Sequence, residues 1–311
     1  MIAAISYPPI PIFELGPLNL SLHGLFAGLG FVGGAALMIR EVKRRGFDVD
    51  KVVSVLTWGL VASMLGARFF TVPAHMFDAG YGFSDAISIT GDYSILGGYA
   101  GGIIGGVLRM RMLNLPPLAL LDTAAPGLAI GAVIGRIGDI AIVEHLGSET
   151  SFFLGYTLKP GYDISPQHNA IERLCNIDGI CGTYHHTGLY DMIGAAVLLG
   201  FILYVRKRWT GYHYGQLFAV WAVWYGFQRF LIDFTRLDAA RNGTVADSVM
   251  GPFTGSQWGA LGAAVLGIAF FVWARRHSQV VTTERDITYG AVLPGVAEEE
   301  VVGEETEDVD S

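Results

Sequence analysis

The sequence predicts an all-α integral membrane protein with seven transmembrane helices, and three observations lead to this prediction. Apolar residues make up 52% of the 311 residues and charged residues only 15%, with a mean hydropathy of +0.45. Soluble domains carry about a quarter charged residues. The apolar residues are gathered in long segments, and clusters of Lys and Arg follow every second segment.

Seven apolar segments are long enough to cross a bilayer as helices, which takes roughly 20 residues. The fourth and sixth carry charged residues near their ends, and they are the least regular of the set. The predicted spans are Leu20–Ile39, Val52–Val72, Ile95–Met112, Leu118–Ile137, Leu189–Val205, Gly215–Ile232 and Trp258–Trp273.

Basic residues predict the orientation of these spans. Cytoplasmic loops are enriched in Lys and Arg, and the stretches "REVKRRGF", "RMRM", "RKRW" and "ARRH" follow the first, third, fifth and seventh spans. The intervening loops are poor in basic residues. We therefore expect the N-terminus outside, the C-terminus in the cytoplasm, and a multi-pass protein of the bacterial cytoplasmic membrane.

Charge also divides the chain into a membrane domain, residues 1–277, and a tail, residues 278–311. The tail holds ten of the 28 acidic residues and one basic residue, Arg285, and this composition is typical of disordered segments. In the predicted topology the tail is cytoplasmic and loop 145–186 lies on the outer face. Cys175 and Cys181 in that loop form either a local disulfide or two free thiols.

Glycine pairs recur every four residues in "GGYAGGIIGG", from Gly97 to Gly106. This spacing leaves one helix face bare, and a neighbouring helix can then pack closely against it. A bare face also lets a lipid chain approach the backbone, and the two interpretations are compatible.

Ionisable residues inside the fourth and sixth spans are the main functional signal. Arg136 and Arg229 lie at similar depth toward the outside, and Arg68 of the second span lies near that depth too. One arginine can snorkel to the interface, but several converging charges usually face a bundle interior and mark a functional path. Because the guanidinium fork fits a phosphate, we expect a site for an anionic phospholipid headgroup. Ion channels instead use acidic rings or carbonyl filters.

Several motifs together resemble the bacterial prolipoprotein diacylglyceryl transferases. "GRIGDIAIVEHLG" is similar to the family hallmark G-R-x-G-N-F-x-N-x-E with its closing glycine, and "LGGYAGG" is similar to G-G-x-x-x-H-G-G. "PIFELGPLNLSLHGLFAGLGF", "HHTGLYD" and "YGFQRFLIDFTRLD" resemble the entry, the H-P-S-Q-L-Y-E and the Y-G-x-x-R-F-x-x-E-x-x-R motifs. The five motifs occur in the family's order.

The resemblance implies a reaction. Such enzymes transfer the diacylglyceryl group of phosphatidylglycerol to the lipobox cysteine thiol in a prolipoprotein signal peptide, and they release glycerol phosphate. The departing phosphate needs preorganised cations and the thiol needs deprotonation. By motif position the implied catalytic residues are Arg136, Arg229, Glu144, Tyr99 and His23. The implied lipid-binding residues are Arg136, Asp139, Gly147, Tyr225, Arg229, Arg236, Gly101 and Gly102, with Asp233 at the acidic position beside them.

The chain departs from the family pattern at several positions. Ala100 in "LGGYAGG", in the third predicted span, replaces the histidine of G-G-x-x-x-H-G-G. Asp139 and Ile142 replace the two asparagines of the hallmark. In "HHTGLYD", Gly188 and Asp191 replace the Gln and Glu of H-P-S-Q-L-Y-E. A carboxylate at Asp139 would repel a lipid phosphate unless Arg136 pairs with it or it is protonated.

Three interpretations follow from these departures. The enzyme uses another base, for which His23, His185, His186 and Glu144 are the candidates; or the fold acts on another lipid or acceptor; or the protein binds an anionic phospholipid or signal peptide without catalysis. A transporter that only mimics these motifs is a further alternative, from a different functional class. No motif resembles a metal, nucleotide-cofactor or nucleic-acid site, so the expected partners are phosphatidylglycerol, prolipoprotein signal peptides and the bilayer.

Overall fold

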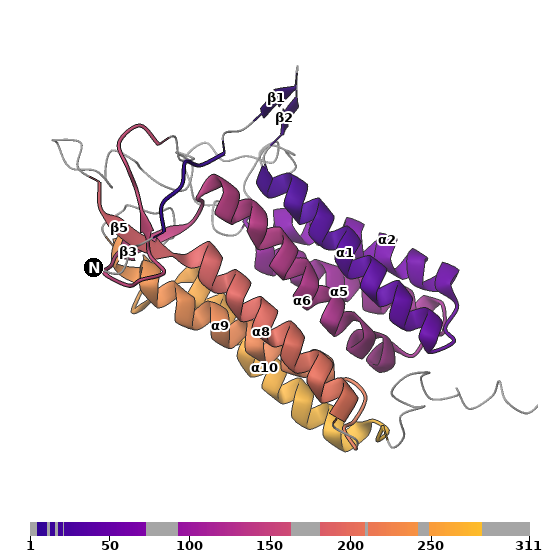
Figure 1. Ribbon diagram of the computed structural model, residues 1–311. Coiled ribbons are helices and arrows are strands. Elements are labelled where there is room, and N and C mark those ends of the chain that lie inside the picture. Colours follow the sequence, from indigo (N-terminus) through magenta and orange to yellow (C-terminus); the bar gives the residue numbers. More distant parts are fainter. Residues whose placement is uncertain are drawn as a thin grey trace, which may run out of the picture.

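The computed structural model describes residues 5–10, 13–15, 18–20, 22–72, 93–162, 181–208, 211–241 and 249–281. Within these ranges the chain is mostly helical, with seven long helices (Figure 1). The helices are α1 Leu22–Arg44, α2 Val49–Phe69, α5 Ile95–Met112, α6 Pro117–Ile142, α8 Thr187–Arg208, α9 Gln216–Arg241 and α10 Gly255–His277. Each of the seven predicted segments overlaps one of them.

Five helices are long and apolar enough to cross a membrane: α1, α2, α6, α8 and α10. The other two are less apolar for reasons visible in their sequences. α5 contains the six glycines of "GGYAGGIIGG" and has Arg109 and Arg111 in its last turn. α9 carries charged residues along much of its second half.

The helices pack in pairs. α1 lies on α6, α2 on α5 and α10 on α9, while α8 contacts both α6 and α9 (Figure 1). α6 is the most enclosed, because half of its most apolar stretch is buried, against 17% for α1. The helix that carries Arg136 and Asp139 is therefore at the centre of the bundle.

Glycines set the close pairings, as the glycine stripe predicts. A Cβ on Gly34 of α1 would lie 2.5 Å from the carbonyl oxygen of Gly127 of α6, and one on Gly30 would lie 2.5 Å from that of Gly131. On α5, Gly101 faces the backbone of α2, while Gly98 and Gly102 also border a cavity. The prediction of close helix packing at the stripe is confirmed.

The basic helix ends gather at one end of the bundle. Arg206 at the end of α8 pairs with Glu41 near the end of α1 at 2.8 Å. Arg109 near the end of α5 donates to Ser54, in the first half of α2, at 2.9 Å. The bundle is thus polarised. The last turns of α1, α5, α8 and α10 carry the basic residues, and the short sheets lie at the opposite end of the helices (Figure 1).

Three small antiparallel sheets join the helices, so the prediction of an all-α chain was incomplete. β1 Phe13–Leu15 pairs with β2 Leu18–Leu20, and β6 Val249–Met250 pairs with β7 Phe253–Thr254. β3 Leu146–Glu149, β5 Thr183–His186 and β4 Tyr156–Thr157 form a sheet in that spatial order. Strands of two to four residues are too short to show the alternation by which strands are recognised in a sequence.

The described parts of loop 145–186 lie at the end opposite the basic residues. Cys181 is disulfide-bonded. Of the two alternatives given by the sequence, a disulfide or a free thiol, Cys181 therefore forms a disulfide. Cys175 lies outside the described residues. At the other end, the tail starts in contact with the body: Val281 is buried and exchanges backbone hydrogen bonds with Gly211 and Tyr212. Residues 278–281, which the sequence predicts as part of the tail, therefore pack against the helical body.

Candidate active site

Two helices present the charged residues because of their spacing. On α9, Tyr225, Arg229, Asp233 and Arg236 are separated by four, four and three residues and share one face. On α6, Arg136 and Asp139 are three residues apart and share a face in the same way. The local helix geometry alone thus aligns the two arginines with acidic partners.

Asp191 of α8 joins the two arginines. Its carboxylate lies 2.7 Å from Nη2 of Arg136 and 3.6 Å from Nη1 of Arg229. Arg136 also pairs with Asp139, and Arg229 pairs with Asp233 at 3.1 Å. Three helices, α6, α8 and α9, therefore meet at one carboxylate with a guanidinium on each side.

A polar relay holds Asp191 in place. Gln228 donates from Nε2 to Oδ1 of Asp191 at 3.1 Å, and Trp224 donates from Nε1 to Oε1 of Gln228 at 2.8 Å. Gly194 on α8 makes room for the Gln228 side chain, because a Cβ there would collide with it. The arginine pair is thus anchored to a side chain that is itself fixed.

His23 at the start of α1 brings a second titratable group to the same place. Its Nδ1 lies 2.5 Å from Oδ1 of Asp139 and 3.4 Å from Oε2 of Glu144. Glu144 is flanked by Val143 and His145, which have φ values of 55° and 64°. Left-handed backbone is unfavourable for a β-branched residue such as Val143, so the chain holds a strained turn where it aims Glu144 at His23.

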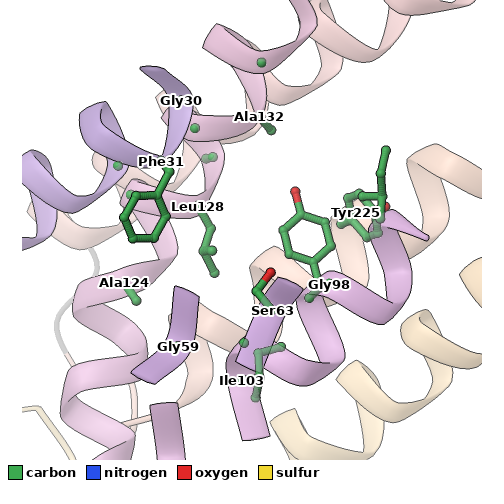
Figure 2. Close-up of a pocket in the computed structure, with 18 of the residues that line it drawn as sticks. Gly30, Phe31, Gly59, Ser63, Gly98, Ile103, Ala124, Leu128, Ala132 and Tyr225 are labelled. Carbon is green, nitrogen blue, oxygen red and sulfur yellow. The ribbon is translucent and has the colours of Figure 1, made fainter. Parts of the chain in front are cut away.

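A cavity of about 550 Å³ adjoins this cluster of charged groups. Its polar lining includes His23, Tyr99, Arg136, Asp139, Asp191 and Tyr225. Elsewhere the wall is mostly apolar or bare, and Figure 2 shows Phe31 of α1, Ile103 of α5 and Leu128 of α6 around the space. The cavity therefore has one charged end and a long apolar body.

Aromatic rings close the side between α5 and α9. Tyr99 makes edge contacts with Trp221 and Tyr225, with ring centroids 5.1 and 5.0 Å apart. Trp221 and Tyr225 stack at 5.7 Å. Their position beside Arg136 places two phenol groups near the charged end of the cavity.

The structure gathers most of the predicted site residues and separates a few. Arg229 and Glu144 do not line the cavity, but they contact residues that do, through Asp191 and His23. Gly102 lines it, whereas Gly101 faces α2.

Three other predicted residues lie away from the cavity wall. Gly147 packs against α9, where a Cβ would lie 2.5 Å from the carbonyl oxygen of Thr235. Arg236 and Arg68 are buried and are not among the lining residues.

In the motif "LGGYAGG" of α5, the residue that faces the cavity is not the one that the motif comparison suggests. Ala100, at the family's histidine position, is exposed and does not line the cavity, while the preceding Tyr99 does. A histidine at position 100 would therefore not face this cavity, and Tyr99 is the side chain of this motif that borders it.

Sequence reasoning missed the central role of Asp191 and did not consider Gln228. Asp191 appears in the sequence only as a replacement for the motif's glutamate, and nothing in its neighbours indicates that two arginines from other helices reach it. Gln228 precedes Arg229 in "YGFQRF", and only the approach of α8 to α9 reveals its contact.

The two other histidines considered as bases lie in strand β5, and neither lines the cavity. Nε2 of His186 is 2.9 Å from the hydroxyl of Tyr7, and Nδ1 of His185 is 3.2 Å from that of Tyr190. Burial lowers the pKa of His186 to about 4 and raises that of Tyr7 to about 12. Burial also lowers the pKa of His185. Both imidazoles therefore favour the neutral form.

His23, Asp139 and Glu144 also have ligand atoms close enough to hold a metal ion, all within 4.8 Å of one another. However, Arg136 already binds Asp139, and a guanidinium on that carboxylate opposes a second cation. The arrangement fits proton transfer better than metal binding.

A family described as prolipoprotein diacylglyceryl transferase matches residues 11–273. The chain belongs to this family. Proteins named phosphatidylglycerol--prolipoprotein diacylglyceryl transferase are similar along most of their length. The one from Staphylococcus saprophyticus is 29% identical over 240 residues, 76% of this chain and 81% of that protein. Those from Bacillus cytotoxicus and Bacillus mycoides are 27% and 29% identical, each covering 86% of this chain and 92% of the relative. Membership of the family agrees with the resemblance inferred from the motifs.

Proposed function

We propose that this protein transfers the diacylglyceryl group of phosphatidylglycerol to the lipobox cysteine thiol of a prolipoprotein, with release of glycerol phosphate. The names of its relatives state this donor and this acceptor. The single observation that carries the proposal is the pair Arg136 and Arg229, joined by Asp191 at the charged end of an otherwise apolar cavity.

The arginine pair suits the leaving group. Cleaving the bond between the glyceryl carbon and the phosphate oxygen develops negative charge on that oxygen, and donors already in place stabilise it. Arg136 holds Asp139 with one guanidinium nitrogen and Asp191 with another, and its side chain lines the cavity. A lipid phosphate would take over part of the hydrogen bonding that these carboxylates now provide.

The apolar body of the cavity suits the rest of the substrate. Two acyl chains need an apolar surface, and small or bare residues such as Gly59 and Gly98 leave room along α2 and α5 (Figure 2). Tyr99 and Tyr225 lie where the apolar wall meets the charged end. We infer that the glyceryl backbone lies beside these rings, with Gly102 below them.

The remaining candidates support the site from outside the cavity wall. Glu144 contacts His23, Asp233 pairs with Arg229, and Arg236 lies one turn further along α9. Gly147 lets β3 approach α9. We propose that these residues fix the orientation of the groups that touch the lipid.

We further propose that all seven helices span the cytoplasmic membrane, with the N-terminus and the cavity's charged end toward the outside. Large apolar side chains face outward on several helices, including Val32 on α1, Met64 on α2, Ile104 on α5 and Leu266 on α10, each more than 60% exposed. The basic ends of α1, α5, α8 and α10 would then lie in the cytoplasm, with the acidic tail beside them and the sheet of loop 145–186 above the cavity.

Transfer is tested with the purified protein in phosphatidylglycerol-containing nanodiscs and a lipobox peptide. We expect the peptide to gain the mass of one diacylglyceryl group, and Arg136→Ala to abolish the gain. Arg241→Ala, an exposed arginine on the same helix as Arg229, is the matched control and should keep full activity. Lipid binding without any mass gain would support the non-catalytic interpretation instead.

Orientation is tested with single cysteines in a chain in which Cys175 and Cys181 are replaced by serine. Lys159→Cys and Lys207→Cys place exposed thiols at the two ends of the bundle. A membrane-impermeant maleimide should label the first in intact cells and the second only after permeabilisation. The reverse pattern would overturn the proposed topology.

A further inference from the structure

His23 combines three features that no other described histidine has in this structure. It lines the cavity, it contacts two carboxylates, and its side chain is 43% exposed while those of Asp139 and Glu144 are 2% and 7% exposed. An imidazole that opens to a substrate space and is backed by buried carboxylates has the arrangement of a general base with its orienting acid.

The contact with Asp139 defines the chemistry of the ring. A neutral imidazole that donates Nδ1–H to Oδ1 of Asp139 carries its lone pair on Nε2, so Nε2 is the nitrogen that accepts a proton. The carboxylate then stabilises the imidazolium that forms. Glu144, 3.4 Å from Nδ1, adds a second negative charge beside the same ring.

Close approach of α1 to α6 is needed to make this contact. A Cβ on Gly138 would lie 2.7 Å from the carbonyl oxygen of Leu22 and 2.9 Å from Cα of His23. Only glycine at position 138 lets the first turn of α1 reach Asp139. Gly138 and Asp139 are adjacent in the sequence: Gly138 lets α1 approach, and Asp139 binds His23.

Asp139 is shared between the base and the phosphate site. One of its oxygens contacts His23 and the other contacts Nη1 of Arg136. A phosphate that binds Arg136 competes with Asp139 for the guanidinium, and it leaves the carboxylate to His23 alone. The state of the imidazole is thereby linked to occupancy of the lipid site.

Resting on the proposed function, we infer that His23 is the proton acceptor for the attacking thiol, and that phosphate binding at Arg136 activates it by releasing Asp139. The thiol proton passes to Nε2 of His23 and the sulfur bonds to the glyceryl carbon that carries the phosphate ester. The carbon–oxygen bond breaks and its electron pair stays on the phosphate oxygen. Glycerol phosphate leaves and His23 returns its proton to the solvent or to that product.

A selenocysteine peptide separates this role from a merely structural one, because a selenol is ionised at neutral pH and needs no base. With a cysteine peptide we expect His23→Gln to lower kcat about 100-fold or more. With the selenocysteine peptide the deficit should shrink to less than about tenfold. Arg136→Lys, which weakens the phosphate site, should be slow with both peptides.

Gly24→Ala is the control for disturbance of α1, since the added methyl group meets no atom within 4 Å, and it should behave as wild type. Gly138→Ala should resemble His23→Gln, including recovery with the selenocysteine peptide. Equal deficits of His23→Gln with both peptides, or no deficit with either, would overturn the assignment while leaving the proposed function intact. A wild-type protein that transfers to neither peptide would overturn the proposed function and this inference with it.

The link to Arg136 is tested by NMR of labelled histidine nitrogens, with His23→Gln identifying the His23 signal. The ligand is a phosphonate analogue of phosphatidylglycerol in which CH2 replaces the oxygen that would depart. We expect the analogue to shift the His23 signal toward imidazolium in the wild type and not in Asp139→Asn. A signal unchanged by the analogue in the wild type would show that lipid binding does not act on His23.

Discussion

Buried charges gather at both ends of the bundle, but they are satisfied in different ways. At the charged end of the cavity, Arg136 and Arg229 share the carboxylate of Asp191 and each contacts a further aspartate. At the basic end, Asp122 of α6 is fully buried and accepts hydrogen bonds from the backbone N–H groups of Gly215 and Phe218, at 2.7 and 2.9 Å.

The difference lies in what the charges face. Asp122 is held by backbone donors at the start of α9, where unpaired N–H groups favour an anion, and it does not border the cavity. The carboxylates near Arg136 contact arginine and histidine side chains beside a space large enough for a ligand. A buried charge within a span thus indicates a binding site when it adjoins a cavity and a structural anchor when it ties down a helix end.

The largest expected effect is on the cavity side of this comparison. Arg136→Lys keeps the positive charge but loses the planar fork that serves two oxygens at once. We expect transfer to fall about 100- to 1,000-fold, with the melting temperature nearly unchanged, as measured by peptide mass shift and thermal unfolding in detergent. A fully active Arg136→Lys enzyme would show that the fork is not used.

Asp122→Ala should show the opposite pattern. Removing the carboxylate leaves two buried N–H groups without an acceptor, and this costs about 2–4 kcal/mol of the free energy of unfolding. Activity per folded molecule should be retained. Asp238→Ala, an exposed aspartate on α9, is the control with little effect on either quantity. Loss of activity without loss of stability in Asp122→Ala would remove the distinction between the two ends.

Much of the fold follows from the sequence because seven apolar segments and four basic clusters are strong, local signals. Arg136, Arg229 and His23 follow from motif positions as well. The role of Asp191 does not, because it depends on three helices converging on one carboxylate. The outward direction of Ala100 also escapes sequence reasoning, since a motif gives the order of residues along a helix and not the rotation of that helix in the bundle.

Helix packing near the cavity gives a smaller effect. Gly34→Ala places a methyl group 2.5 Å from the carbonyl oxygen of Gly127, so α1 and α6 must separate. We expect a loss of about 1–3 kcal/mol in the free energy of unfolding. Gly28→Ala on the same helix meets no atom within 4 Å and should be neutral or slightly stabilising. Equal stability of the two variants would argue against the close α1–α6 contact.

The smallest expected effect is a pH dependence of stability from His186 in strand β5. The pKa of His186 is lowered by burial to about 4, from an ordinary value of 6.5. Between these values the unfolded chain binds a proton that the folded chain does not, so stability is present above pH 6.5 and is lost as the pH falls toward 4. From pH 6.5 to 5 the loss should be about 1–2 kcal/mol. Thermal unfolding of His186→Gln should lack this component, and an unchanged slope would contradict it.

The central claim is that Arg136 at the cavity wall and Arg229 behind Asp191 together receive the phosphate of one lipid. A structure determined with the phosphonate analogue of phosphatidylglycerol tests it most directly. We predict the phosphonate oxygens within hydrogen-bonding distance of Arg136 and Arg229. The acyl chains should lie along Phe31, Ile103 and Leu128. A headgroup bound elsewhere, while Arg136 still holds both Asp139 and Asp191, would contradict the account.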